Sequence, residues 1–322
     1  MRSLRWIGLL ALYVGAQAVA LLLASPFRSA GLATNSNPNS LAGPLEIVVI
    51  IVIAPLFILY VARRQGGLAA LRHLILFGIA GALYVTLYST ILVVLPQGIL
   101  LPPYSGEVVV YPALTLAACL SGALYLALLM EPQWWVVDLV GFLAAGSLIA
   151  ILGISFAVLP AILLLIALLV YDAIAVYGTK HMVSLAEVVT DMKLPILLVM
   201  PDRPGFDYAA SGSLKQQRAR PVEEREALFM GLGDVVIPGT LVVSAFIWLP
   251  SHPALLGVGG NLWAALGALL GSLVGYATLM RIVLRGNAQA GLPFLNGGAL
   301  AGYVVAYVLV FHSFALGLTG GL

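Results

Sequence analysis

The stretches ILLLIALLVYDAIAVYG (162–178) and LFMGLGDVVIPGTLVV (228–243) each place one aspartate, Asp172 and Asp234, inside an apolar run. Runs of this length and apolarity are typical of membrane-spanning helices. An ionised carboxylate at the centre of a bilayer costs about 2.5–3.5 kcal/mol on insertion scales. Two such costs in one chain predict a functional site, because two neighbouring buried acids form a pair that handles protons.

The composition is that of a membrane protein with many spans. Of the 322 residues, 62% are hydrophobic and 9% are charged, whereas soluble domains carry about 25% charged residues. The formal net charge of +2 is too small to predict a nucleic-acid partner. The single Cys119 excludes an internal disulfide, and the four histidines show no metal-ligand spacing. We therefore expect an all-α protein embedded in the lipid bilayer, with no metal and no cofactor.

Nine segments are apolar and long enough to span a bilayer, which requires about 20 residues. The first resembles a signal peptide, but its apolar run exceeds the roughly 7–15 residues typical of such peptides, so we interpret it as a helix. Gly153 is the expected turn between the fifth and sixth spans. The predicted spans are 4–25, 44–62, 70–95, 108–130, 134–152, 154–178, 228–249, 262–284 and 292–316.

These spans divide the chain into six helices (1–178), a polar loop (179–227) and three helices (228–322). All but one of the 15 Lys and Arg residues, Arg28, then fall on one side of the membrane. Because basic residues favour the cytoplasmic side, we expect a cytoplasmic N-terminus and loop and an external C-terminus. Within the loop, 179–193 predicts a helical extension and LPILLVMP (Leu194–Pro201) a short extended segment.

Small residues predict where two helices pack closely. Gly267, Gly271 and Gly275 repeat every four residues, as do Gly298 and Gly302. Because glycine has no side chain, this spacing lets two membrane helices approach one another. We therefore expect the eighth and ninth spans to use these glycines in helix packing.

The two acids are expected to lie at matching depth on consecutive antiparallel helices. Asp172 lies eight residues before Lys180, and Asp234 lies nine residues after Arg225. If the helices are continuous, each acid lies about 12–14 Å from the nearest cytoplasmic charge. Pro238 lacks the N–H that would bond the carbonyl of Asp234, and weakened backbone at membrane depth is tolerated beside a wet cavity. The sequence thus predicts a hydrated pair in which one acid activates water and the other protonates a carbonyl oxygen.

The pair of motifs Tyr171-Asp172 and Gly231-Leu232-Gly233-Asp234 resembles that of the presenilin and signal peptide peptidase family. Members of that family are nine-helix intramembrane aspartyl proteases. The resemblance implies that Asp172 and Asp234 are catalytic, and that the substrates are single-span transmembrane proteins. The chain lacks a long acidic insertion, which suggests a compact microbial, archaeal homologue that acts without accessory subunits.

Other segments extend the resemblance. The family's third motif, Pro-Ala-Leu, is matched by Pro293-Phe294-Leu295 within GLPFLNGG, with phenylalanine in place of alanine. Leu194–Pro201 resembles the region that pairs with substrate as a strand, and strand addition would expose the backbone of a helical substrate. Tyr171 is expected either to pack or to hydrogen-bond near the site. Asp138, which follows two tryptophans at a helix start, is expected to lie at the membrane interface.

Three alternatives remain open from the residues alone. The acids could form the proton pathway of a proton-coupled transporter or channel, although no inverted repeat is visible. A prepilin-type peptidase also uses a Gly-x-Gly-Asp motif, but Val235-Val236 stand where it would have a basic residue. A membrane scaffold without activity would leave the acids without a role.

Overall fold

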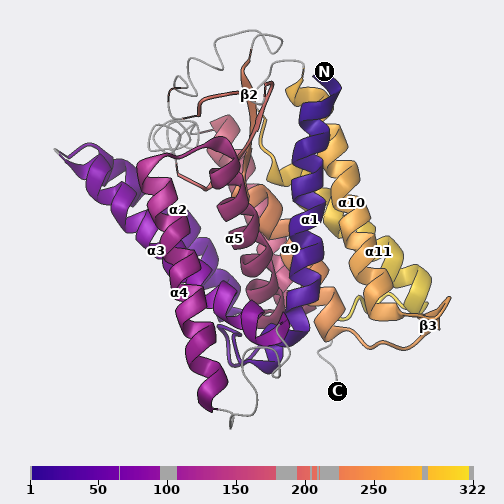
Figure 1. Ribbon diagram of the computed structural model, residues 1–322. Coiled ribbons are helices and arrows are strands. Elements are labelled where there is room, and N and C mark those ends of the chain that lie inside the picture. Colours follow the sequence, from indigo (N-terminus) through magenta and orange to yellow (C-terminus); the bar gives the residue numbers. More distant parts are fainter. Residues whose placement is uncertain are drawn as a thin grey trace.

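The computed structural model describes residues 2–64, 66–94, 107–178, 194–203, 205–208, 210, 225–284 and 289–318. Within these ranges, nine α-helices form one bundle (Figure 1). They are α1 (Arg2–Ser29), α2 (Ala42–Ala62), α3 (Gly67–Val94), α4 (Glu107–Met130), α5 (Trp134–Ser155), α6 (Val158–Ala173), α9 (Leu232–Trp248), α10 (Gly260–Val283) and α11 (Leu292–Phe311). A π-helical turn, η1 (Ile174–Gly178), continues α6.

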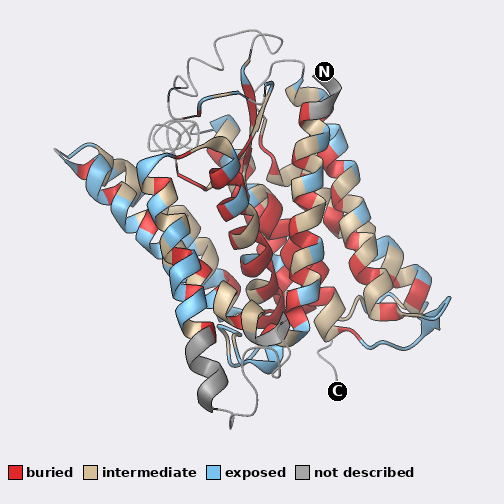
Figure 2. Cartoon of the chain, viewed as in Figure 1, coloured by how far each residue is buried: buried red, intermediate tan, exposed pale blue. Residues whose placement is uncertain are grey.

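Eight of the described helices are long and apolar enough to cross a membrane, counting α6 together with η1, and α9 is a shorter apolar helix of 17 residues. The prediction of an all-α membrane protein with nine helices is therefore confirmed. Figure 2 shows buried residues gathered on α5 and α9 at the centre, whereas α3 and α4 carry many exposed positions. Exposed apolar side chains such as Phe77 and Leu126 suit contact with lipid.

The turn between α5 and α6 lies at Phe156 and Ala157, which are both extended, so the prediction that Gly153 forms it is wrong. Gly153 lies inside α5 and faces α9. A β-carbon on Gly153 would fall 2.4 Å from Val243, and one on Gly239 would fall 2.9 Å from Ile149. These glycines let α5 and α9 pack closely at the centre of the bundle.

The start of the seventh predicted span is a strand, so the helix prediction for residues 228–231 is wrong. Strand β2 (Ala227–Gly231) pairs antiparallel with β1 (Leu197–Pro201). Backbone groups that pair with a distant strand need no helix to satisfy them, and α9 begins only at Leu232. The extended segment predicted within Leu194–Pro201 is confirmed.

The remaining boundaries differ from prediction by a few residues. The ninth span ends at Phe311 because His312 adopts a left-handed conformation with φ 50°. A second small sheet, β3 (Ala254–Leu255) with β4 (Val258–Gly259), precedes α10. The helical extension predicted at 179–193 lies outside the described residues.

The predicted glycine packing is confirmed, and it joins α10 to α11 backbone to backbone. A β-carbon on Gly271 would lie 2.1 Å from the carbonyl oxygen of Gly298, and one on Gly302 would lie 2.1 Å from that of Gly267. No side chain fits at such distances, so the two helices form one rigid pair.

Alanine at Gly271 should lower the stability of the protein. The added methyl group has no space and should destabilise the bundle by about 1–3 kcal/mol, measured by thermal unfolding in detergent micelles. Gly78→Ala on α3 is the control, because a β-carbon there meets nothing within 4 Å. Equal unfolding temperatures for the two variants would contradict the close packing of α10 on α11.

Candidate active site

The β1–β2 sheet lies at the end of the bundle that carries the N-terminus (Figure 1), and Asp234 follows the last residue of β2 by three residues. Asp172 is the last but one residue of α6, and Asp234 is the third residue of α9. Because β2 precedes α9 directly, the assumption of a continuous helix from Arg225 to Asp234 is wrong. Asp234 instead occupies a first helical turn, where the helix dipole favours a negative charge.

The backbone at the start of α11 contacts both carboxyl groups. The N–H of Leu292 donates to Oδ2 of Asp172 at 3.0 Å. A β-carbon on Gly291 would lie 2.8 Å from each carboxyl oxygen of Asp234. Asp172, which is 7% exposed, and the half-buried Asp234 therefore converge on one short backbone segment.

Two further contacts hold α11 against α6, and sequence reasoning missed both. The hydroxyl of Tyr177 on η1 donates to Oε1 of Gln289 at 2.6 Å and accepts the N–H of Ala290 at 3.4 Å. Deeper in the bundle, Nδ2 of the buried Asn296 donates to the carbonyl of Leu165 at 2.9 Å. Asn296 directly follows the third motif, and a buried amide at that place was the available signal.

The third motif forms the first turn of α11. Pro293 occupies an early helical position, where the missing N–H is harmless. Leu295 is fully buried, and the side chain of Phe294 packs against the main hydrophobic core. A β-carbon on Gly275 of α10 would lie 2.1 Å from the carbonyl oxygen of Phe294. Gly275 on α10 therefore leaves space for the backbone of the motif, and the core accommodates the phenylalanine ring.

The residues before Asp234 link the β-sheet to the acid. Gly231 ends β2, and a β-carbon on it would lie 3.4 Å from Oδ2 of Asp234. The N–H of the buried Leu232 donates to the carbonyl of Ile196 at 3.0 Å. Gly233 is exposed, and a β-carbon there would meet nothing within 4 Å. The acid is thus held in place by the strand that precedes it.

Two other polar side chains bond the backbone of neighbouring elements. The hydroxyl of Tyr171 donates to the carbonyl of Ile51 on α2 at 3.5 Å. Asp138 is 5% exposed, and its Oδ1 accepts the N–H of Val199 in β1 at 2.7 Å. The carboxyl of Asp138 is therefore buried against the sheet, and its expected place at the membrane interface stays a prediction.

The chemistry of the site rests on two carboxyls without a cation. Among the described residues, neither Asp172 nor Asp234 forms an ion pair, and no group of three metal-ligating side chains gathers in the same ranges. Two close carboxyls in low dielectric favour holding one proton between them. Such a pair contains both an acid and a base for the activation of water.

A bundle of apolar helices that brings two carboxyls together in this way defines an aspartyl protease of the membrane. The model of the signal-peptide peptidase, presenilin aspartyl protease family matches residues 10–312, and the chain belongs to this family. It is therefore an intramembrane aspartic endopeptidase.

Two solved structures are similar over nearly the whole chain, and each is of a presenilin family intramembrane aspartate protease. The one in space group C222 shares 29% sequence identity with a TM-score of 0.64 and covers 95% of this chain and 99% of its own. The one in space group P2 shares 31% identity with a TM-score of 0.61 and covers 94% and 97%. Comparison with curated proteins gives no match.

Alanine at Gly291 should impair cleavage while sparing the fold. Its methyl group would press on both oxygens of Asp234, and a displacement of about 1 Å in a catalytic group can lower the rate about 100-fold. The cleavage rate of a reconstituted transmembrane substrate measures the effect. Gly297→Ala, in the helix that follows, is the control, because its β-carbon meets nothing within 4 Å. Full activity of the Gly291 variant would contradict the contact.

Proposed function

We propose that Asp172 and Asp234 are the catalytic residues and together hydrolyse peptide bonds of single-span transmembrane substrates. The observation that carries this proposal is the convergence of both carboxyls on the backbone of Gly291 and Leu292. The ionised acid takes a proton from water, and the protonated acid donates its proton to the carbonyl oxygen as the water oxygen attacks the carbon. Collapse of this tetrahedral intermediate delivers a proton to the departing nitrogen.

The start of α11 is proposed to position the acids. The N–H of Leu292 bonds one oxygen of Asp172, which orients that carboxyl and leaves its other oxygen for chemistry. Gly291 supplies the space in which the carboxyl of Asp234 lies. Tyr171, Gly233 and the motif Pro293–Leu295 are proposed as surrounding residues that shape the site and position the substrate.

The pairing of β1 with β2 leaves alternate backbone groups pointing outward. The N–H of Leu232 bonds Ile196, and the N–H of Asp202 bonds Glu226 at 2.8 Å. Since antiparallel pairs alternate, the intervening even-numbered residues face the partner strand, and the odd-numbered residues direct their N–H and C=O groups away from it.

Strand addition by a substrate is therefore proposed at the outer edge of β2 rather than along Leu194–Pro201. On β1, the outward N–H of Val199 already donates to Asp138, and Pro201 has no N–H. On β2, no described residue accepts the outward N–H of the half-buried Phe229, whereas Ala227 is buried. This edge leads within a few residues to Asp234, so a paired substrate would be delivered to the acids.

The orientation in the membrane is proposed from the basic residues. The N-terminus and the β1–β2 sheet lie at one end of the bundle (Figure 1). With nine spans, 14 of the 15 Lys and Arg residues are expected on the N-terminal side of the membrane, which would face the cytoplasm. With the C-terminus outside, the preferred substrates would have external N-termini and be cut near their cytoplasmic ends. We propose that the chain acts without accessory subunits. Neither the family match nor the solved structures support a transporter.

Separate Asp172→Asn and Asp234→Asn variants should each abolish cleavage of a single-span substrate in liposomes. Each amide preserves the shape of the side chain but cannot exchange protons at neutral pH. Products are measured by mass spectrometry against protein-free liposomes. Glu46→Gln, an exposed acid at the start of α2, is the control and should cleave normally. Activity in either aspartate variant would overturn the proposed roles.

Replacement of single substrate amides by esters should reveal the paired strand. Each ester removes one N–H, and a lost hydrogen bond of about 1 kcal/mol lowers kcat/KM about fivefold. Because side-by-side strands bond at every second residue, the loss should recur with a period of two along the substrate segment beside the scissile bond. A uniform effect, or no effect, at successive positions would contradict strand addition.

A further inference from the structure

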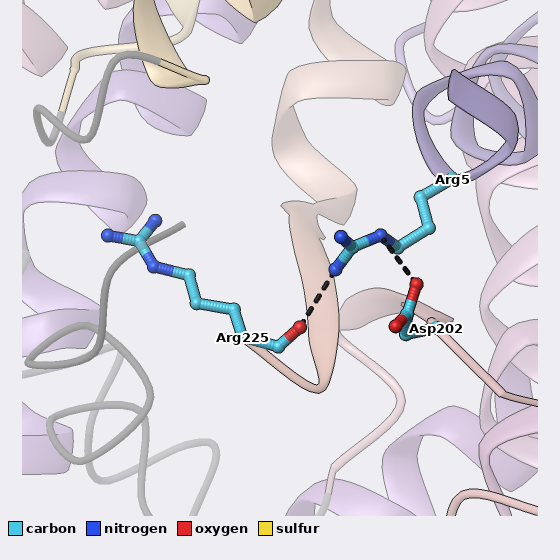
Figure 3. A network of polar contacts seen from close by, with 3 residues as sticks. All are labelled: Arg5, Asp202 and Arg225. Carbon is cyan, nitrogen blue, oxygen red and sulfur yellow. Dashed lines mark hydrogen bonds and ion pairs between the residues drawn. The ribbon is translucent and has the colours of Figure 1, made fainter. Parts of the chain in front are cut away.

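A buried arginine joins the first helix to the open end of the β1–β2 sheet, where β1 ends and β2 begins. Arg5 on α1 is 6% exposed. Its Nη1 donates to the carbonyl of Arg225 at 2.8 Å, and its Nε lies 3.3 Å from Oδ1 of Asp202 (Figure 3). Asp202 follows β1 and Arg225 precedes β2, so one guanidinium holds both chain ends of the sheet.

A buried carboxyl on α5 bonds the edge of β1 that faces away from β2. Oδ1 of Asp138 accepts the N–H of Val199 at 2.7 Å, whereas its Oδ2 has no hydrogen-bond partner among the described residues. A buried carboxylate with so few partners is costly unless it has a specific role. This bond to the middle residue of β1 supplies one.

Glycines on α1 and α5 bring these anchors close to the sheet. A β-carbon on Gly8 would fall 2.4 Å from Cε of Met200, and one on Gly141 would fall 3.1 Å from Cδ2 of Leu198. Gly8 lies one helical turn from Arg5, and Gly141 lies one turn from Asp138. Each helix therefore offers β1 a bare backbone surface beside a polar anchor.

We propose that Arg5 and Asp138 are positioning residues that hold the β1–β2 sheet in one place and thereby determine which substrate bond reaches the catalytic pair. The inference rests on the proposed function for its effect on cleavage. A two-stranded hairpin is marginally stable in isolation, and a weakly held strand is prone to change register. Anchors on the two flanking helices restrict that movement. Neither residue contacts the carboxyls of Asp172 or Asp234, so both would act through the sheet.

Hydrogen exchange tests the anchoring without requiring activity. Asp138→Leu removes the acceptor, and amides of β1 and β2 should exchange about tenfold faster while those of α10 remain protected. Asp138→Asn retains an acceptor oxygen and should restore slow exchange. Arg5→Met should speed exchange at the open end of the sheet. Arg28→Met is its control, because Arg28 lies at the other end of α1 against Trp248. Unchanged exchange in the Leu and Met variants would overturn the proposal.

The distribution of products tests the consequence for cleavage. The unaltered protein and Asp138→Asn should cut one dominant bond of a reconstituted substrate, whereas Asp138→Leu should spread cuts over neighbouring bonds and raise KM. A lower yield of folded protein would reduce all products equally, so an unchanged product pattern in Asp138→Leu would overturn the positioning role. If the unaltered protein cuts nothing, the proposed function fails, and the exchange measurement still decides whether the anchors hold the sheet.

Discussion

The contact of the α11 backbone with two carboxyl groups is the interaction on which the site depends. Asp172 and Asp234 begin on separate helices, and neither forms an ion pair among the described residues. The N–H of Leu292 and the bare Cα of Gly291 bring both acids to one point. The glycine-to-glycine packing of α10 on α11, together with Asn296 and Tyr177, keeps this backbone segment at the end of α6.

The β1–β2 sheet concerns a second requirement of the site, which is to hold an unwound substrate. A helical substrate satisfies its own backbone, so a protease must unwind it and offer replacement hydrogen bonds. We have proposed that the outer edge of β2 provides these, and β2 ends at Gly231, three residues before Asp234. Helices α1 and α5 support the sheet through Arg5 and Asp138, so elements far apart in the chain act on the same two-stranded sheet.

Predictions from the sequence were confirmed where a local pattern of residues determines the structure. Apolar runs predicted nine helices, the glycine spacing predicted the α10–α11 contact, and the extended segment before Pro201 is β1. It failed where a distant partner decides the outcome. Gly153 looked like a turn because glycine breaks helices, but it accommodates Val243 of another helix. The burial of Asp138 could not be predicted from the residues around it, because its hydrogen-bond partner Val199 lies 61 residues away.

The sequence by itself determined that the protein lies in a lipid bilayer and that it carries two functional acids, because both follow from residue type. Long apolar runs require a bilayer around them, and acids within such runs require a function. Only the tertiary structure decided which backbone meets those acids. Gly291 has an ordinary neighbourhood in the sequence, and its importance arises from a contact with a helix 57 residues earlier. Likewise, residues 228–231 are apolar enough for a helix and become a strand because β1 satisfies their backbone groups.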